Sequence, residues 1–270
     1  MRKTAKEIKN IIKKTVKKGK ISDNSLLKDP DKRKQYHSFI NKSIDKKSNL
    51  IKRRMNNFGK EQMEEFMKKF EKENPKTKSE IRKLFNIKEQ NKKLKELMLP
   101  LVVSIAKEAG QDALDILSIG RNFEVKKIKK DVSLLSLLAK RAEFFAASVN
   151  NTTLAGLVDT LAEGIAEGEG IPKLAKRIRE EYDDISRYRS ELIARTETNA
   201  VVNEATLEAY KQAEVVEGKE WVATLDDRVR DEHLMMDGEV VGLNEPFSNG
   251  EMYPNECNCR CVISPITRMI

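Results

Sequence analysis

Cysteine and long apolar segments are scarce in this chain of 270 residues, and each scarcity excludes a class of protein. Only three cysteines occur, all between Cys257 and Cys261, so the chain has no framework of long-range disulfides and fits a reducing cytoplasm. The longest mainly apolar stretch, residues 97–106, is interrupted by Pro100 and is too short to cross a bilayer. No apolar core of signal-peptide length follows Met1. We therefore expect a soluble protein with no membrane partner.

Aromatic residues, glycine and proline are also few. Aromatic side chains make up 6% of the chain, which has 12 glycines and seven prolines, whereas charged residues make up 35%. This composition is typical of long, surface-rich helices and argues against a sandwich or a barrel. The motifs of P-loop and dinucleotide binding, of zincin proteases and of serine hydrolases do not occur. The sequence therefore predicts a mainly α protein. It contains no motif of these enzyme classes.

Charge is distributed unevenly along the chain. The net charge is +9, but residues 1–100 contain 31 Lys and Arg against 13 Asp and Glu, a net of +18, and residues 101–270 contain 21 against 30, a net of −9. Such a division indicates two parts with different partners. Residues 1–100 are interpreted as a basic helical arm that meets a polyanion or an acidic protein surface; the alternative is a solvated, lysine-rich segment.

The start of this arm is a candidate for nucleic-acid binding. The apolar residues Ile8, Ile11, Ile12 and Val16 recur at helical spacing, and lysines cover the rest of each turn. Phosphate contacts with double-stranded DNA are expected from Lys13, Lys14, Lys17 and Lys18. Few aromatic residues accompany these lysines, so stacking on single-stranded bases is not expected.

Residues 101–218 are predicted to form a helical body, because lysine becomes less frequent and Ala, Leu and Val more frequent after Pro100. Residues 150–153 are interpreted as the start of one helix, and the glycine-rich run 163–170 as its end. One long helix is predicted from Asp184 to Gly218, where the glycine ends it.

Residues 219–270 are predicted to form a small α+β knob. Three short segments rich in β-branched or aromatic residues, at 220–225, 239–243 and 260–264, are separated by turn residues and are typical of strands. The predicted fold is therefore mainly α, with a helical body, a basic helical N-terminal arm and a small C-terminal α+β knob.

The knob contains the residues best suited to chemistry. His233 follows the first predicted strand, and Cys257, Cys259 and Cys261 surround the start of the last one. Thiolate and imidazole ligands in a tetrahedral array suit zinc, and a small unit with few large apolar residues gains stability from a structural metal. We predict zinc bound by His233, Cys259 and Cys261, with Cys257 or a nearby Asp as the fourth ligand. The alternative is a group of buried, reduced cysteines.

The spacing of the cysteines limits this prediction. Residues two apart on a straight strand lie about 6.5–7 Å apart, farther than two sulfurs on one zinc ion, so the cysteine segment has to bend. The other histidine, His37, lies in the polar arm without an evident partner and is expected to be solvated.

A catalytic interpretation uses the same knob. The acidic residues near His233 in the sequence are Asp226, Asp227, Asp231, Glu232 and Asp237. Together with His233 they suit a hard cation or a metal-bound water, as in a metal-dependent hydrolase or nuclease. Such acidic residues more commonly serve turns and helix caps on a solvated face, so this function stays the alternative.

Several motifs occur in a fixed order between about residue 101 and the end of the chain. They are Ala194-Arg195-Thr196-Glu197-Thr198 in the long predicted helix, then Trp221, Asp227-Arg228, Arg230, His233, Asp237-Gly238, Phe247, Pro254 and Asn258-Cys259-Arg260-Cys261. In this order and spacing the sequence resembles the phage head morphogenesis family typified by the Mu F protein. Val229 and Asp231 depart from the family pattern, and Cys257 is an addition to its usual ending.

The resemblance implies a minor head protein, a structural component present in few copies per virion. It implies association with the portal vertex and other head proteins, and assistance in head assembly and in genome packaging or delivery. The implied location is the virion interior, after assembly in the cytoplasm of the bacterial host. No enzyme is implied; some members of this group are fused to ADP-ribosyltransferase toxin domains, but the chain has no extension beyond its cysteine motif, so this activity is not expected.

Overall fold

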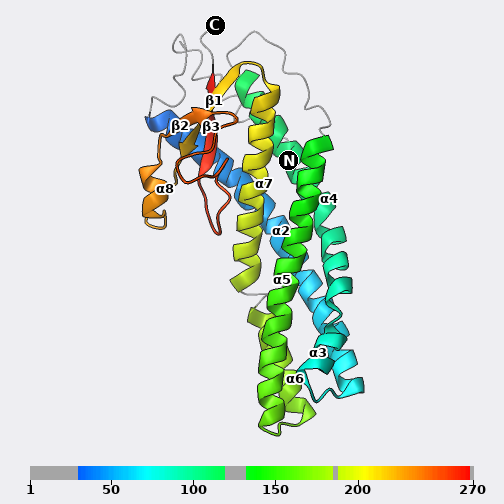
Figure 1. Cartoon of the computed structure of the whole chain (residues 1–270). Helices are drawn as coiled ribbons and strands as arrows, with labels where there is room; N and C mark the ends of the chain where they lie inside the picture. Colours follow the sequence, from blue (N-terminus) through cyan, green and yellow to red (C-terminus); the bar gives the residue numbers. More distant parts are fainter. Residues whose placement is uncertain (1–29, 119–131, 185–187, 268–270) are drawn as a thin grey trace. The chain divides into compact units, whose positions relative to one another are not determined.

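The computed structural model describes residues 30–118, 132–184 and 188–267 (Figure 1). The elements, in chain order, are α2 (Pro30–Glu73), α3 (Lys78–Phe85), α4 (Ile87–Ser118), α5 (Val132–Ala166), α6 (Ile171–Asp184), α7 (Ser190–Gln212), β1 (Val216–Val222), α8 (Asp231–Met235), β2 (Val240–Gly242) and β3 (Val262–Thr267). The prediction of a mainly α fold with a small sheet near the C-terminus is confirmed. None of the described helices is both long and apolar enough to span a membrane. The lysines expected to contact DNA, Lys13, Lys14, Lys17 and Lys18, lie outside the described residues.

The described residues divide into two compact units. We call the first the sheet unit; its described residues fall within Met1–Asp45, Ser104–Leu134 and Thr196–Ile270. We call the second the helical unit; it comprises Lys46–Val103 and Leu135–Arg195. Each unit combines segments that are far apart in the sequence. The division into an arm, a body and a knob at residues 100 and 218 follows the sequence and stays a prediction.

The helical unit has a core formed by side chains of α2, α3, α5 and α6. The buried residues of this core are Phe66, Phe70, Ile81, Phe85, Leu157, Val158, Leu161, Leu174, Ile178 and Tyr182. Helix α3 begins with a capping box, in which the Thr77 hydroxyl accepts a hydrogen bond from the Glu80 amide and the Glu80 carboxylate accepts one from the Thr77 amide. The capping box satisfies amides at the start of α3, and the buried face of this helix contributes Ile81 and Phe85 to the core.

Helix α5 continues through residues 150–153, so the predicted helix start there is wrong. The hydroxyls of Thr152 and Thr153 each donate to the carbonyl oxygen four residues earlier instead of capping a new helix. Asn150 is fully buried, and its side-chain oxygen accepts a hydrogen bond from Gln62 of α2. Polar residues that are common at helix starts therefore find their hydrogen-bond partners inside a helix in this protein, on the backbone of α5 and on α2.

The long helix predicted from Asp184 to Gly218 is present as α7, but both of its predicted bounds are wrong. Helix α6 ends at Asp184, α7 ends at Gln212, and Gly218 lies in β1. A Cβ atom at this position would lie 2.8 Å from the carbonyl oxygen of Val241 in β2. This glycine is therefore required because two strands approach closely there. It plays no part in ending α7.

The sheet has three antiparallel strands in the order β2-β1-β3. Opposite Lys219 of β1 lie Val241 of β2 and Pro265 of β3, and all three predicted strand segments overlap observed strands. The core of the sheet unit contains Ala113, Leu114, Leu117, Leu207, Ala209, Tyr210, Val216, Trp221, Ala223, Met236, Phe247, Cys259, Cys261 and Ile263. Side chains of α4 and α7 thus bury the same core as the strands, and two cysteines belong to it.

The first turns of α2 belong to the sheet unit and lie beside its strands (Figure 1). Arg33 makes a two-pronged ion pair with Asp237, with nitrogen–oxygen distances of 2.6 and 2.9 Å, and also donates to the carbonyl oxygen of Trp221. The Tyr36 hydroxyl donates to the carbonyl oxygen of Ile263 in β3. These residues of the basic segment therefore serve as structural parts of the C-terminal fold.

Candidate metal centre in the sheet unit

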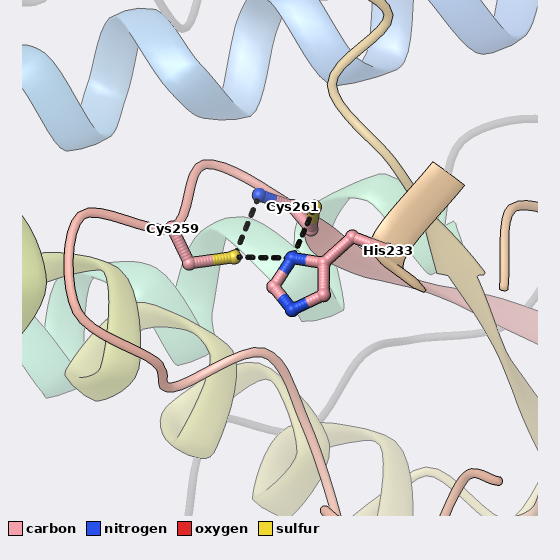
Figure 2. Close-up of side chains that lie close together, drawn as sticks. All are labelled: His233, Cys259 and Cys261. Carbon is pink, nitrogen blue, oxygen red and sulfur yellow. Dashed lines mark hydrogen bonds between the residues drawn. The ribbon is translucent and has the colours of Figure 1, made fainter. Parts of the chain in front are cut away.

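His233, Cys259 and Cys261 form a buried cluster, which we call the His/Cys cluster (Figure 2). The Nδ1 atom of His233 lies 3.6 Å from each of the two sulfur atoms, and the three candidate ligand atoms all lie within 4.8 Å of one another. In a tetrahedral zinc site, bonds of about 2.3 Å to sulfur and 2.0 Å to nitrogen place these two atoms about 3.5 Å apart. The observed separations therefore fit a shared metal ion.

The backbone bends where the sequence requires it. Strand β3 begins at Val262, so Cys259 and Cys261 lie in the irregular segment before it. Asn258 adopts a left-handed conformation with φ of 57°, which redirects the chain just before Cys259. The amide of Cys261 donates to the sulfur of Cys259 at 3.4 Å. The bend removes the conflict between straight-strand spacing and a shared ligand site.

Three of the four predicted ligands come together, and Cys257 does not join them. Cys257 is exposed, and its sulfur accepts a hydrogen bond from the Thr196 hydroxyl at 3.9 Å. His233 comes from the short helix α8, and its side chain is 2% exposed. The His/Cys cluster thus supplies one nitrogen and two sulfurs, and a role for Cys257 as a ligand stays a prediction.

The pKa values of the two buried thiols are shifted in opposite directions. The hydrogen bond from Cys259 and that from the Thr224 amide lower the pKa of Cys261 to about 6, although burial opposes the shift. The hydrogen bond to Cys261, together with burial, raises the pKa of Cys259 far above its ordinary value. Since the thiolate is the form that binds metal, the lowered pKa of Cys261 favours metal binding, and a metal would have to displace the proton of Cys259.

A carboxylate lies on the other side of the imidazole. The Nε2 atom of His233 is 3.2 Å from Glu256, although the two atoms are not aligned as a hydrogen bond. A carboxylate at this distance favours the proton on Nε2 and leaves the lone pair of Nδ1 directed at the sulfurs, which is the arrangement common behind metal-bound histidines. The indole ring of Trp221 packs edge-on against the imidazole at 5.2 Å and restricts its rotation.

Three arginines line a small cavity at the His/Cys cluster. The cavity measures about 100 Å³, and its lining includes all three cluster residues together with Arg228, Arg230 and Arg260; we call it the arginine pocket. Arg260 makes a two-pronged ion pair with Asp226, at 2.5 and 2.8 Å. Arg230 contacts Glu256 at 3.2 Å and donates to the carbonyl oxygen of Cys257. Arg228 is the most exposed of the three, and its side chain lies 3.8 Å from Asp226.

Side chains of helix α7 hold the cysteine segment by hydrogen bonds to its backbone. The Thr196 hydroxyl accepts a hydrogen bond from the Asn258 amide at 2.9 Å. The side chain of Asn203 is fully engaged, because its nitrogen donates to the carbonyl oxygens of Pro254 and Cys261 and its oxygen accepts from the Ile263 amide. Sequence reasoning named Thr196 and missed Asn203, which carries no motif and reaches partners about 50–60 residues later in the chain.

Two of the remaining family-motif residues serve structural contacts within the sheet unit. Asp237 binds Arg33 and also accepts a hydrogen bond from the Ala223 amide. Gly238 has a positive φ of 87°, and its amide donates to the carbonyl oxygen of Trp221. Both residues therefore fix the turn that follows α8 against β1 and the start of α2.

Three further family-motif residues, Arg195, Glu197 and Asp227, are not members of the His/Cys cluster. Arg195, within the helical unit, lies 3.6 Å from Glu191 one turn earlier. Glu197 has a partner, and Asp227 is exposed. None of these three belongs to a group with metal-ligand spacing among the described residues.

Among the described residues, Glu232 is the one acidic residue named near His233 in the sequence that lies at metal-ligand spacing from it, and Asp226, Asp227, Asp231 and Asp237 do not. Asp226 is paired with Arg260, and Asp237 with Arg33. Among the described residues, the second group with metal-ligand spacing is Glu232, His233 and Glu256, which shares its histidine with the His/Cys cluster. The geometry therefore favours a soft, thiolate-bound metal over the hard cation of the catalytic alternative.

The expectation that His37 is solvated is wrong. Its Nε2 atom lies 3.1 Å from the Thr224 hydroxyl and 3.2 Å from the carbonyl oxygen of Arg260. Burial lowers the pKa of this imidazole, and the hydrogen bond to Arg260 opposes the shift. The partners lie 187 and 223 residues away in the sequence, so the polar neighbours of His37 in the chain gave no sign of them.

Comparison with known proteins gives one family and several relatives. Residues 155–264 match the family described as Phage Mu protein F like protein. The minor head protein GP7 of Bacillus phage SPP1 is 28% identical over 151 residues, which make up 51% of this chain and 47% of that protein. The NAD(+)–arginine ADP-ribosyltransferase EFV of Enterococcus faecalis is 25% identical over 221 residues, or 68% of this chain and 43% of that protein. The chain thus spans about half the length of these relatives or less, and no solved structure matches it.

Proposed function

Since the chain belongs, through residues 155–264, to the family of phage Mu protein F-like proteins, we propose that it is a minor head protein with a structural role in the phage head. The observation that carries this proposal is the family match over the His/Cys cluster and over the elements that hold it. The similarity to the minor head protein of phage SPP1 supports the same role.

The contacts of the family-motif residues suit a structural protein. Thr196 binds the backbone of the cysteine segment, Trp221 fills the core, and Asp237 fixes the start of α2. These side chains are used within the fold. An enzyme of this size commonly presents its polar motif residues to a substrate pocket, whereas the arginine pocket is far smaller than the roughly 300–1,000 Å³ of small-molecule sites.

We also propose that the His/Cys cluster holds a structural zinc ion. The donor set of two thiolates and one imidazole suits zinc, and the 3.6 Å nitrogen–sulfur separations fit tetrahedral bonding. The metal would link α8 to the segment that enters β3 and so stabilise a unit whose sheet has only three strands.

The proposed partners are the portal protein, other head proteins and packaged DNA. A net charge of +18 in residues 1–100 supports contact with DNA phosphates or with an acidic protein surface. We propose a position at the portal vertex, inside the virion, where a basic segment meets the genome during packaging or delivery.

The test is to isolate procapsids and mature heads of the phage or prophage that encodes the chain, on a density gradient. Quantitative mass spectrometry of each fraction then gives the number of copies per particle, with the major capsid protein as internal standard. We expect a few copies in particles that contain the portal and a proportional loss in particles assembled without the portal. Absence from every particle, with the chain left unassembled, contradicts a structural head role.

The enterococcal relative raises a separate question about activity. Its name states an ADP-ribosyltransferase, but the match covers 43% of that protein, so the name does not assign the activity to this chain. We propose a non-enzymatic role. Transfer of label from NAD⁺ to an arginine-containing acceptor by the purified chain would contradict it.

A further inference from the structure

The His/Cys cluster supplies fewer ligands than zinc takes in a closed site. A structural zinc is almost always bound by four protein ligands, whereas a site with three protein ligands keeps one position for an exogenous group. Among the described residues, no fourth His, Cys, Asp or Glu side chain joins the three-membered group. Cys257 is exposed, and its sulfur accepts a hydrogen bond from Thr196. The question is what completes the coordination.

The arginine pocket lies where an exogenous ligand would enter. All three members of the His/Cys cluster are among its lining residues, so a metal held by them faces this cavity. A volume of about 100 Å³ is roughly three times the 30 Å³ that one water molecule occupies in the liquid. The enclosed part of the pocket therefore fits a group of a few heavy atoms.

The charges at the pocket favour an anion. A divalent metal and two thiolates neutralise one another, which leaves the three guanidinium groups of Arg228, Arg230 and Arg260 against the carboxylates of Asp226 and Glu256. Asp226 and Glu256 pair with Arg260 and Arg230, and Glu232 lies near Glu256, so the guanidinium group most available to an anion is that of Arg228. Arg228 is held only loosely, since its guanidinium lies 3.8 Å from Asp226 and its side chain is 66% exposed. Guanidinium groups match the oxygen geometry of phosphate and carboxylate.

We propose that the arginine pocket binds one phosphate group, which completes the coordination of a metal in the His/Cys cluster and is held by Arg228 and Arg230. This inference rests on the proposed metal site. Phosphate is favoured over carboxylate because its additional oxygens can contact the metal and more than one guanidinium group at once. The group comes from free phosphate or from the backbone of DNA, and the experiment separates these sources.

The test uses the full chain with cobalt(II) in place of zinc, because zinc itself has no visible spectrum. The visible absorption of cobalt(II) bound to thiolates reports both the coordination number and an exchange of the non-protein ligand. Titration with inorganic phosphate is expected to change these bands in a saturable way. The double variant Arg228→Gln, Arg230→Gln is expected to bind cobalt normally and phosphate about tenfold or more weakly, since the removal of each charged hydrogen bond weakens binding on that scale.

Two controls isolate the pocket. Arg179→Gln removes an exposed arginine of α6, in the helical unit, and is expected to leave phosphate binding unchanged. Cys257→Ser is expected to leave the cobalt spectrum unchanged, because its sulfur is outside the cluster. In a parallel titration, a short DNA duplex that produces the same spectral change identifies the DNA backbone as the source, and a response to inorganic phosphate alone identifies the free ion.

Each contrary result has its own meaning. Failure to bind cobalt or zinc removes the proposed metal site. Binding of cobalt with a spectrum that ignores phosphate and changes in Cys257→Ser establishes a closed site with four protein ligands and overturns this inference, while the proposed zinc site survives. Equal responses to acetate and phosphate overturn the assignment of phosphate.

Discussion

Cys259 is the single residue on which the candidate metal centre depends most. Its sulfur lies 3.6 Å from Nδ1 of His233 and also accepts the amide hydrogen of Cys261. In Cys259→Ser the hydroxyl is a poor ligand for zinc, so we expect loss of the metal. A destabilisation of about 3–4 kcal/mol, typical of the removal of a metal site, lowers the thermal midpoint of a chain of this size by roughly 10 °C. Metal analysis after dialysis and a thermal melt measure both effects.

Cys257→Ser is the matched control for this prediction, because it makes the same substitution two residues away at an exposed site. We expect its metal content and melting to equal those of the unchanged chain. A chelator should reproduce the melting of Cys259→Ser in the unchanged chain and have no effect on the variant. If Cys259→Ser retains its metal and its thermal midpoint, the cluster is a pair of buried thiols and not a metal centre.

A second residue-scale prediction concerns Gly218. Its replacement by alanine places a Cβ atom 2.8 Å from the carbonyl oxygen of Val241 and forces two paired strands apart. We expect Gly218→Ala to destabilise the sheet unit by about 1–3 kcal/mol, as overpacking does elsewhere. Gly59→Ala is the control, since a Cβ at Gly59 in α2 meets nothing within 4 Å. This change should stabilise the helix by about 0.5–1 kcal/mol. Chemical denaturation of both variants gives the sign of each effect, and a neutral Gly218→Ala contradicts the observed strand spacing.

At this scale the sequence predicts the candidate ligands better than it predicts the residues that support them. His233, Cys259 and Cys261 are rare residue types that lie close together in the chain, and the structure brings them together. His37 and Arg33 escape prediction because their partners are about 190–220 residues away. Asn258 carries a usable signal, since asparagine tolerates the left-handed conformation that bends the cysteine segment.

At the scale of elements, charged pairs join α2 to α4 within the helical unit. Glu65 of α2 lies 2.8 Å from Lys93 of α4 and 2.6 Å from Lys69 of its own helix. Hydrogen bonds from Lys69 and Lys93 lower the pKa of Glu65 to about 2. A carboxyl group with a lowered pKa in the folded state stabilises the fold above its unfolded pKa, near 4.5, and this contribution disappears as the pH falls toward 2.

We therefore expect Glu65→Gln to lower the thermal midpoint at pH 6–7 and to have a progressively smaller effect below pH 4.5. The side chain is 30% exposed, and solvent screening limits such a pair to about 1 kcal/mol or less, equivalent to roughly 2–4 °C. Glu64→Gln, at the exposed neighbouring position, is the control and should show no such difference. Melts of the three proteins between pH 3 and 7 measure the effect; parallel curves for Glu65→Gln and the unchanged chain would contradict it.

The same scale shows where local sequence signals mislead. Residues 150–153 have the composition of a helix start, yet they lie inside α5, because a buried partner on α2 satisfies Asn150. Gly218 has the composition of a helix stop, yet it lies in a strand. In both cases a contact with another element decides the role of the residue, and local propensity is overridden. The strand segments are predicted correctly because each is a short run rich in β-branched or aromatic residues, and turn residues separate these runs.

At the scale of the whole molecule, the division of charge at residue 100 does not coincide with the division into compact units. Residues 1–100 carry the basic charge, but they contribute to both units, since the boundary between the units falls at Lys46 within α2. A sequence read from one end to the other cannot reveal that α2 begins in the sheet unit, because this depends on contacts such as that of Tyr36 with Ile263. The charge itself can attract a polyanion whatever the fold.

The last prediction concerns the binding of double-stranded DNA by the lysines near the start of the chain. Replacement of Lys13, Lys14, Lys17 and Lys18 by glutamine removes four positive charges from the start of the chain. If these lysines bind phosphates, the affinity falls, and the slope of log affinity against log salt becomes shallower by about 0.9 for each phosphate that is no longer neutralised. Fluorescence anisotropy with a labelled duplex at several salt concentrations measures both quantities.

The control has to remove the same charge elsewhere in the basic segment. Replacement of the exposed residues Lys68, Lys83, Lys88 and Lys92 by glutamine changes the net charge equally, so it separates specific phosphate binding from general attraction. We expect the control to retain most of the affinity and the full salt slope. Equal decreases in both variants mean that DNA senses only the net charge, and no decrease in either removes DNA from the proposed partners, which leaves the basic segment to an acidic protein surface of the head.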